Sequence, residues 1–421
     1  MASNSRSPIS RRTWIAATSG AVAAGLIKTK ADAVKLVAQE APTPPDDPTK
    51  VPGRFTSEVG VRAPEERPRR LTRSQTLSSS SRTPLQELQG TITPADLHFE
   101  RHHAGIPDIR AGRHELLVHG MVERPMVFSM ADLKRYPSVA RTYFLECSGN
   151  GGGAYNRERM PVEITPQALD GLLSTSEWVG VPVKTILNEV GADPAATWIL
   201  AEGADAAVMS RSVPMEKIMD DSLLAYGQNG EAIRPEQGYP LRLLLPGWEG
   251  NASVKWLRRI EVTDRPTMTR DETSRYTDPL KGGLSRQFSF FMDAKSTITF
   301  PAYPYTLPDT GWWEIQGLAW TGRGRITRVD ISTDGGRSWA EAELQEPILP
   351  KSTVRFRHLW NWDGSESLLI SRAVDETGYV QPTVQQLWEA RGERTAYHNN
   401  QQRVWKVGSN GAVTFGLGDL V

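Results

Sequence analysis

One cysteine stands out among the residues whose type and position could do chemistry. Cys147 follows Arg141–Glu146, a segment typical of a strand, and precedes the small-residue run from Ser148 to Gly153. A side chain at a strand end, beside a loop of small residues, leaves room for a bulky group to approach the backbone. We interpret Cys147 as a thiolate metal ligand or a nucleophile; the alternative is a small buried hydrophobic residue.

Basic side chains at three other places could hold an anion. Arg101, His102 and His103 form a cluster that could bind an anion or supply protons, although a polar surface loop would have the same composition. Arg242 is the only charge in Tyr239–Gly247, which predicts a buried strand, and a buried guanidinium needs a partner such as a phosphate. Lys255 follows shortly afterwards and adds a second cation.

Composition excludes several classes of protein. The 421 residues contain 49 Lys and Arg against 49 Asp and Glu, so the zero net charge gives no general attraction to nucleic acid or to an anionic membrane. A single cysteine excludes an intrachain disulfide, a multi-cysteine zinc or iron–sulfur site, and covalent attachment of a c-type haem on this chain. A chain of this length predicts two domains.

The first 33 residues have the pattern of an export signal. Arg11 and Arg12 precede the apolar stretch from Trp14 to Ile27, and Ala31-Asp32-Ala33 offers a small-x-small cleavage site. The apolar stretch is too short to span a membrane. The pair of arginines resembles a twin-arginine signal, which carries folded proteins to the periplasm, and an ordinary secretion signal is the alternative.

The organisation of the remaining chain follows from composition and periodicity. Residues 34–83 are rich in proline, serine and charge, and we expect an extended or disordered linker. Glu115–Val122 predicts a strand, and Ser129 begins a short capped helix that ends at Pro137. Strand patterns dominate from Phe288 onward: Glu314–Trp320, Arg325–Ser332 and Ser338–Leu344, with a hairpin turn at 334–336.

These patterns predict an α+β protein with a mixed α/β domain over 84–265 and an all-β sandwich over 288–421. Core packing is the first interpretation of the many tryptophans in the second domain, and anchoring of an interface is the other.

Together the motifs resemble the sulfite oxidase family of molybdenum enzymes. The resemblance rests on Arg101-His102-His103, Cys147-Ser148-Gly149-Asn150, Pro240-Leu241-Arg242 and Ser253-Val254-Lys255-Trp256, in that order, within a likeness that runs from Gln89 to the C-terminus. Within the family the chain is most similar to the molybdenum subunit of periplasmic sulfane dehydrogenases, through Phe99–His103, Leu200–Asp205 and Met268–Ser274. The resemblance implies a molybdopterin-binding domain followed by an immunoglobulin-like dimerisation domain.

The resemblance also implies a role for each matching residue. Cys147 would be the protein ligand of molybdenum, and Arg101 and His103 would face the substrate, where a guanidinium can stabilise developing negative charge. Tyr276 is the candidate for the family's active-site tyrosine, with a core or interface aromatic as the alternative. The molybdopterin cofactor would be held by Phe99, His102, Asp205, Arg242, Ser253, Val254 and Lys255.

The activity implied is oxidation of reduced sulfur by oxygen-atom transfer. The expected substrate is sulfane sulfur on a sulfur-carrier protein, and electrons would pass to a separate c-type cytochrome subunit, since this chain attaches no haem. A homodimer through the C-terminal domain is expected, and neither a nucleic acid partner nor a membrane span.

Departures from the family pattern leave alternatives open. Sulfite-oxidising relatives carry an arginine five positions after the metal cysteine, where this chain has Gly152, and their usual histidine is Gln237 here. Loss of that cation disfavours a free dianion, although a sulfite dehydrogenase remains an alternative. The segment from Tyr397 to Asn400 replaces another arginine-bearing stretch of the relatives, and its role stays open. From other classes, a hydrolase using Cys147 with His102 or His103, or a β-sandwich scaffold protein, would also accommodate parts of the pattern.

Overall fold

The computed structural model describes residues 52–154, 162–280, 282–392 and 396–416. The expected export signal and the linker up to residue 51 lie outside the described residues. Residues 52–62 belong to a different compact unit from residues 63–421 and are exposed, without helix or strand. In the described part of the chain, no helix has both the length and the apolar composition required to cross a membrane.

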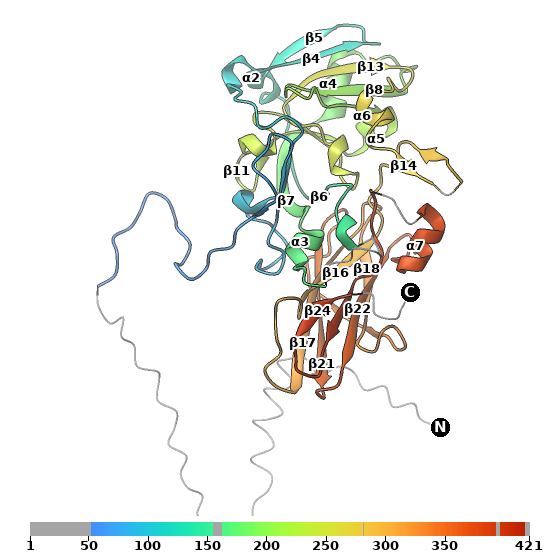
Figure 1. Ribbon diagram of the computed structural model, residues 1–421. Coiled ribbons are helices and arrows are strands. Elements are labelled where there is room, and N and C mark those ends of the chain that lie inside the picture. The colour runs from blue at the N-terminus through green and yellow to red at the C-terminus, as the bar shows by residue number, and fades with distance from the viewer. Residues whose placement is uncertain (1–51, 155–161, 281, 393–395, 417–421) are drawn as a thin grey trace, which may run out of the picture. The chain divides into compact units, whose positions relative to one another are not determined.

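The first domain is built on two five-stranded sheets (Figure 1). One follows the order β11-β10-β7-β6, with β12 also pairing with β10; its strands are β6 (Val139–Glu146), β7 (Leu173–Pro182), β10 (Leu223–Gln228), β11 (Glu231–Ala232) and β12 (Arg242–Leu244). The other follows β5-β4-β13-β8-β9, made of β4 (Glu115–Gly120), β5 (Met126–Ser129), β8 (Trp198–Gly203), β9 (Ser210–Pro214) and β13 (Leu257–Thr263). Only β4 and β13 pair in parallel among these described strands.

Short helices accompany the sheets, and capping residues or glycines mark some of their ends. The helices are α2 (Met130–Leu133), α3 (Pro166–Asp170), α4 (Val183–Val190), α5 (Met215–Asp220), α6 (Arg270–Thr273) and, in the second domain, α7 (Val384–Arg391). The expected strand at Glu115 and the capping box of Ser129 with Asp132 are both confirmed. Helix α4 buries Val183, Ile186, Leu187 and Val190, which recur at helical spacing on one face. It ends at Gly191, whose left-handed backbone stops the helix.

A small sheet at the start of the described domain differs from the sequence expectation. Strands β1 (Leu71–Thr72), β2 (Ser80–Arg82) and β3 (Glu100–Arg101) pair in that order, although the linker was expected to be extended or disordered up to residue 83. The reason is that backbone and polar side-chain hydrogen bonds, rather than apolar burial, attach this segment. The buried amide of Gln167 donates to the carbonyls of Arg69 and Arg82, each at 2.8 Å.

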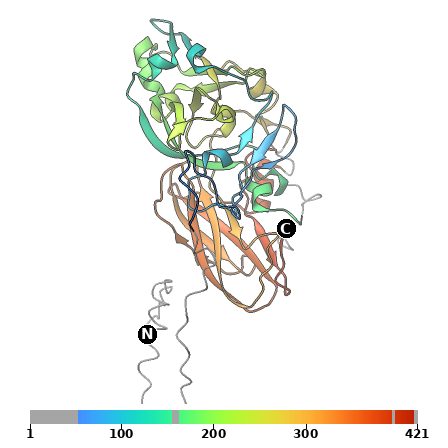
Figure 2. The ribbon, with the colours of Figure 1, turned by 90° about the vertical axis from the view of Figure 1, so that its left-hand side faces the viewer.

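The second domain is the expected β-sandwich. One sheet has the order β16-β17-β21-β20 and the other β19-β18-β22-β23-β24, and in Figure 2 these strands run side by side in the orange-to-red part of the ribbon. The strands are β16 (Lys295–Phe300), β17 (Gly311–Trp320), β18 (Ile326–Ser332), β19 (Ala340–Glu341), β20 (Glu343–Leu344), β21 (Val354–Trp362), β22 (Ser367–Asp375), β23 (Val404–Val407) and β24 (Val413–Phe415). A two-stranded ribbon of β14 (Asp278–Pro279) and β15 (Ser285–Arg286) precedes it.

Two details of the sandwich prediction differ in the structure. The single strand expected over Ser338–Leu344 is two short strands, because the chain leaves one sheet after β19 and joins the other at β20. Trp320, Trp360 and Trp362 of the second domain pack in the core, as first interpreted, whereas Trp312 is 68% exposed. A side chain on a sandwich surface is not distinguished from a core one by residue type alone.

Candidate active site

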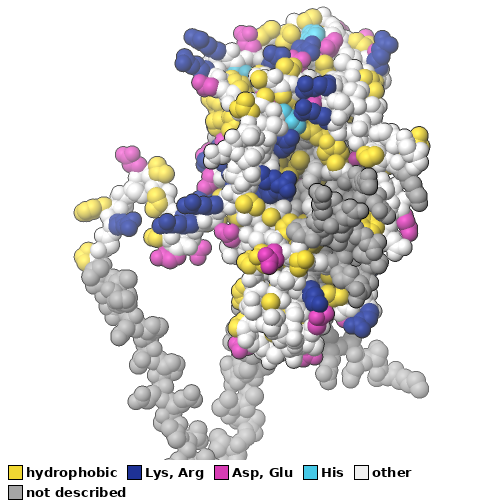
Figure 3. All heavy atoms as spheres, in the orientation of Figure 1, with side chains coloured by type: hydrophobic (Ala, Val, Ile, Leu, Met, Phe, Trp, Pro, Cys, Tyr) yellow, Lys and Arg dark blue, Asp and Glu magenta, His cyan; other side chains and the backbone are white. Residues whose placement is uncertain are grey.

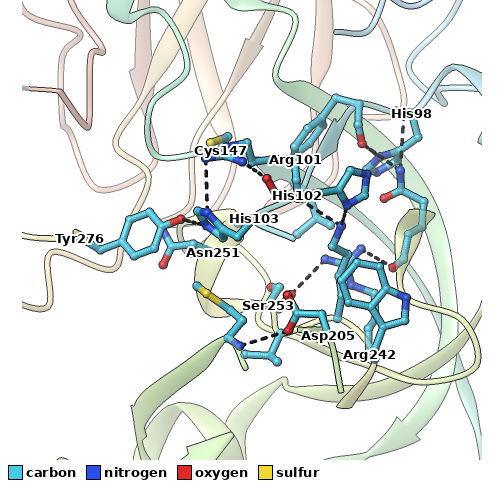
Figure 4. A pocket seen from close by; sticks show the side chains of 18 residues that line it. His98, Arg101, His102, His103, Cys147, Asp205, Arg242, Asn251, Ser253 and Tyr276 are labelled. Atoms are coloured by element: carbon cyan, nitrogen blue, oxygen red, sulfur yellow. Dashed lines mark hydrogen bonds between the residues drawn. The ribbon is translucent and has the colours of Figure 1, made fainter. Parts of the chain in front are cut away.

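The residues singled out in the sequence converge on one cavity of the first domain. This inner cavity has a volume of about 70 Å³. All eleven predicted site residues line it: Phe99, Arg101, His102, His103, Cys147, Asp205, Arg242, Ser253, Val254, Lys255 and Tyr276. In Figure 4, Cys147, Arg101, His103 and Tyr276 lie toward one side of the cavity, and Asp205, Ser253 and Arg242 toward the other.

Two cations deep in the cavity, Arg242 and Lys255, have no carboxylate within ion-pair distance among the described residues. The buried Arg242 donates to the carbonyls of Gln237 at 2.9 Å and Ser253 at 3.1 Å, and its guanidinium lies over the ring of Trp178. Lys255 donates to backbone carbonyls and to His102 Nδ1. Burial, followed by the charge of Arg242, holds the pKa of Lys255 well below its usual value. Two neighbouring cations in a low-dielectric site call for an anion between them.

The hydrogen bonds of His102 establish its protonation. Lys255 Nζ lies 2.8 Å from His102 Nδ1, and an ammonium can only donate, so Nδ1 accepts. The proton is then on Nε2, which donates to Glu100 over 2.7 Å. Burial, despite the hydrogen bond to Glu100, lowers the pKa of His102, so the ring is neutral. His102 thereby holds the Lys255 ammonium in place.

The lining of the inner cavity has the chemistry to hold a polar anionic group. His98 Nε2, Arg242 Nε and Asn251 Oδ1 are buried without a hydrogen-bond partner among the described residues, and all three side chains line the cavity. Buried polar atoms are normally satisfied, so this set of donors and acceptors matches a ligand with a phosphate and a heterocycle. In the described ranges, no group of three His, Cys, Asp or Glu side chains could hold a metal ion. Cys147, which lines the cavity, would be a single thiolate donor suited to a soft metal.

A second, outer cavity opens beside Cys147. It measures about 410 Å³ and shares Arg101, His103, Cys147 and Tyr276 with the inner cavity. The remaining lining residues are Arg73, Ser78, Ser80, Arg82, Gly149, Leu172, Arg275 and Tyr397. The four shared side chains thus separate a chamber suited to a cofactor from a chamber suited to a substrate.

His103 and Tyr276 form a hydrogen-bonded pair whose direction follows from the arginines around it. Arg275 lies 2.8 Å and Arg101 3.4 Å from His103 Nδ1, and guanidinium groups only donate, so this nitrogen accepts. Nε2 then donates to the Tyr276 hydroxyl over 2.8 Å, which leaves the phenol proton to donate into the cavity. Burial and the nearby Arg101 and Arg275 lower the pKa of His103 to about 4, and burial raises that of Tyr276.

The environment of Cys147 disfavours the cysteine hydrolase. Burial raises the pKa of its thiol, the opposite of what an activated nucleophile needs. Both ring nitrogens of His102 and of His103 already have partners other than the thiol. Cys147 also lines both cavities, which is unlike a residue that only fills the core.

The loop after Cys147 rests on a buried ionic network from the second domain. Lys295 Nζ lies 3.0 Å from both Glu146 and Asp170, and Arg403 binds Asp170 at 3.1 Å. Gly151 has φ +77°, and a Cβ there would lie only 2.2 Å from the Arg403 guanidinium. Part of the glycine run therefore makes room for the second domain, rather than for a ligand as the sequence interpretation had it.

Several lining residues had not been recognised in the sequence. His98 precedes the matching motif by one position, and Arg275 precedes Tyr276, so proximity to a motif could have signalled both. Arg73 and Arg82 lie in the polar segment taken as a linker, where no pattern pointed to a site. Gly152, the position of the missing arginine, is not among the lining residues, so the outer cavity obtains its cations from other segments.

Comparisons with known proteins agree with this geometry. The profile of the oxidoreductase molybdopterin binding domain matches residues 103–270, and that of the Mo-co oxidoreductase dimerisation domain matches residues 286–404. Sulfite oxidase from Gallus gallus is 30% identical over 86% of this chain and 82% of its own length. The NADH nitrate reductase of Solanum lycopersicum is 29% identical over 74% of this chain but only 38% of the reductase.

A solved structure is similar over nearly the whole chain. The sulfane dehydrogenase SoxCD from Paracoccus pantotrophus shares 42% identity and a TM-score of 0.78, over 93% of this chain and 99% of the matched one. The two domains, the cavity and these similarities give one conclusion. The chain belongs to the sulfite oxidase family of molybdopterin-binding oxidoreductases.

Proposed function

We propose that this chain is the molybdenum subunit of a periplasmic sulfane dehydrogenase. It oxidises sulfane sulfur on a sulfur-carrier protein and passes electrons to a c-type cytochrome subunit. The observation that carries the proposal is the 42% identity to the SoxCD sulfane dehydrogenase over 99% of the matched chain. The cofactor, when bound, supplies oxygen-atom transfer and accepts the electron pair from sulfur.

The chain's own residues would bind the cofactor and donate hydrogen bonds to the oxygen transferred to sulfur. Arg242 and Lys255 suit the anionic end of the cofactor. The unpartnered His98 Nε2 suits a donor group of its heterocycle, because Nδ1 donates to the Phe99 carbonyl and Nε2 is left as an acceptor. Arg101 and the Tyr276 hydroxyl border the outer cavity, where a cation and a neutral donor stabilise negative charge on transferred oxygen. The size of the outer cavity, about 410 Å³, is that of a pocket for a drug-sized group, which favours an arm carrying sulfur over a small free ion.

Export and assembly belong to the same proposal. The twin-arginine pattern at Arg11-Arg12 would deliver the protein to the periplasm already folded around its cofactor. The match of residues 286–404 to a dimerisation domain supports a homodimer through the sandwich.

The first test is the molybdenum content of purified protein. We expect about one molybdenum per chain by inductively coupled plasma mass spectrometry, and a large loss in Cys147→Ser, because a hydroxyl is a poor donor to a soft metal. A chain without molybdenum from cells able to make the cofactor would overturn the proposal.

The second test separates substrates. Reduction of the copurified cytochrome is followed with a persulfidated carrier and with free sulfite. Formation of nitrite from nitrate is measured separately with an added electron donor. Faster turnover of the carrier supports the proposal. Turnover of sulfite alone would favour a sulfite dehydrogenase, and activity with nitrate alone would overturn oxidation of sulfur.

A further inference from the structure

One buried arginine differs from the others in the described chain. Arg211 and Arg403 are fully buried and pair with carboxylates at 2.9 Å and 3.1 Å. Arg355 is 7% exposed and donates to the carbonyls of Leu88 and Gly90. Arg82 is also nearly buried, at 6% exposure, yet its single described hydrogen bond runs to the carbonyl of Leu169 at 3.5 Å. No described carboxylate lies within ion-pair distance of it.

An unpaired guanidinium in a low-dielectric environment is costly, so its retention calls for a reason. A buried charge is normally paired or fully hydrogen-bonded. The pKa of Arg82 falls to about 10, because burial and the charge of Arg73 disfavour the cation, although Cys147 and Asp170 act in the opposite direction. Arg82 therefore remains a cation at neutral pH.

Strand pairing aims Arg82 into the outer cavity. In β2 the side chains of Ser80 and Arg82 lie on one face, because side chains alternate along a strand. Both line the outer cavity, while Ser81 between them turns the other way and bonds to Glu100. Ser80 pairs with Arg101 on β3, and on the other side its carbonyl accepts from Arg73 N at 3.2 Å. A transverse row of Arg73, Ser80 and Arg101 therefore flanks Arg82 on one face of the sheet.

All the charged side chains of the described cavity wall are basic. Arg73, Arg82, Arg101 and Arg275 line it, and no described Asp or Glu does. Of these, Arg275 has a carboxylate neighbour, Asp271, at 3.8 Å. Lysine and arginine side chains, in dark blue, also gather along the middle of the face seen in Figure 3. A wall of this kind concentrates anions.

We propose that Arg82, with Arg73 and Arg275, forms a subsite for the oxyanion of an oxidised sulfur group in the outer cavity beside Cys147. The fork of a guanidinium binds two oxygens of one tetrahedral oxyanion at once. The identity of the oxyanion rests on the proposed function, since oxidation of sulfur yields a sulfonate or sulfate group. The existence of the subsite rests on the geometry alone.

The subsite supplies positive charge that the family pattern places at position 152. Position 152 is glycine, and the charge instead enters on β2, in the segment attached by Gln167. The oxyanion could be a free ion or a sulfonate still attached to a carrier, because both present the same three oxygens to Arg82.

The test uses the holoenzyme and measures binding of sulfate by isothermal titration calorimetry. We expect Arg82→Gln to weaken sulfate binding at least about tenfold, as loss of a charge-assisted pair should. Arg355→Gln is the matched control, since that buried arginine bonds only to backbone carbonyls outside the cavity, and its sulfate affinity should equal that of the wild type. Unchanged affinity in Arg82→Gln would overturn the proposal.

The melting temperature distinguishes a ligand-binding arginine from a structural one, because loss of a structural arginine would lower it. Without sulfate, Arg82→Gln should melt no lower than the wild type, because the substitution removes an unpaired buried charge, whereas Arg355→Gln should melt lower. A wild-type sulfate affinity together with a lowered melting temperature in Arg82→Gln would identify a structural arginine and exclude the subsite. If Arg82→Gln does not fold, Arg82→Lys tests the same point, and it should bind sulfate more weakly because it lacks the fork.

A second ligand distinguishes the sources of the oxyanion. A short glycine-flanked peptide with an S-sulfonated cysteine is titrated beside sulfate. Arg82-dependent binding of the peptide supports a carrier-bound oxyanion, and Arg82-dependent binding of sulfate alone supports a free one; no dependence with either ligand overturns the subsite. Because neither titration requires turnover, Arg82-dependent binding in an enzyme that fails to oxidise sulfane sulfur would reject the proposed function and leave the subsite standing.

Discussion

At the boundary of the two cavities, the protonation of His103 and Tyr276 follows from their arginine neighbours, because a guanidinium group can only donate hydrogen bonds. The arginines at His103 Nδ1 direct the imidazole proton toward Tyr276, and this in turn frees the phenol proton for the cavity. The raised pKa of Tyr276 keeps that proton on the oxygen. Tyr276 is therefore a neutral donor that does not depend on pH near neutrality.

Tyr276→Phe should lower turnover while leaving molybdenum content unchanged. The variant keeps the ring beneath the Arg211 guanidinium and removes only the donor, so we expect kcat to fall roughly 100- to 1000-fold, as for loss of one donor that stabilises developing negative charge. Tyr305→Phe, in the half-exposed surface of the sandwich, is the control and should be silent. Equal activity in both variants would show that the Tyr276 hydroxyl takes no part.

At this scale the sequence predicted which residues meet, and it did so through short motifs. Eleven residues from well-separated segments were brought together as expected. Arg82 could not be predicted, because its neighbours are serine, threonine and proline, a composition typical of a linker. Its importance arises from burial by distant segments, which composition does not report.

At the scale of elements, the three-stranded sheet β1-β2-β3 is the feature that makes a linker part of the site. It buries few apolar side chains, so its stability depends on a small number of polar contacts. Arg70 pairs with Glu100, and the amide of Gln167 holds the strand from beneath through two carbonyls. Such an attachment can open locally without unfolding the domain.

Gln167→Ala should loosen this sheet. Two carbonyls lose a buried donor, at a cost of about 1–3 kcal/mol. Limited trypsin digestion should then cut faster at Arg69, Arg70 and Arg73, while the melting temperature of the whole protein changes little. Gln385→Ala, on exposed α7, is the control. Wild-type digestion rates in Gln167→Ala would show that other contacts hold the segment.

Elements were predicted best where their periodicity was strong. The strand at Glu115 and the cap at Ser129 appear as expected. The apolar stretch Tyr239–Gly247 contains only a three-residue strand, Arg242–Leu244, because the residues on either side bond elsewhere: the Leu241 carbonyl accepts from Leu257 of β13, and Leu245 N donates to the Ser253 hydroxyl. The break between β19 and β20 likewise arises because β19 pairs with one sheet and β20 with the other. The local sequence pattern does not predict such a change of pairing partner.

At the scale of the whole molecule, the two domains share an interface that is ionic at its centre. Lys295 and Arg403 from the sandwich lie between Glu146 and Asp170, and Trp320 donates to Glu146 at 2.6 Å. Thr175 and Thr353 add a hydrogen bond between the domains at 2.8 Å. Four charges that balance one another inside the protein are stable together and costly when separated.

Asp170→Asn should destabilise the protein strongly at neutral pH and less strongly near pH 3. Removing the carboxylate leaves Lys295 and Arg403 without half of their compensation, a loss of about 3–5 kcal/mol. Arg403 and Lys295 hold the pKa of Asp170 well below its ordinary 3.8, so the stabilisation is present above pH 3.8 and is lost as the pH falls further. Urea unfolding at pH 7 and near pH 3 measures the difference between variant and wild type.

A difference that stays constant over this range would show that the carboxylate does not titrate with unfolding. Asp309→Asn, a loop position remote from the network, is the control and should behave as the wild type at both values. The network could not be predicted from the sequence, because residues 146, 170, 295 and 403 share no local pattern and meet only in the folded chain.

The contact between Gly151 and Arg403 bears on the order of biosynthetic events. The floor of the cysteine loop is supplied by a residue that leaves the ribosome long after Cys147 itself. A nascent chain therefore presents an unfinished pocket until its final strands have emerged, and any large prosthetic group must wait for the completed polypeptide. We therefore expect cofactor insertion to follow completion of the chain, because a chain terminated before Arg403 lacks the side chain on which the cysteine loop rests.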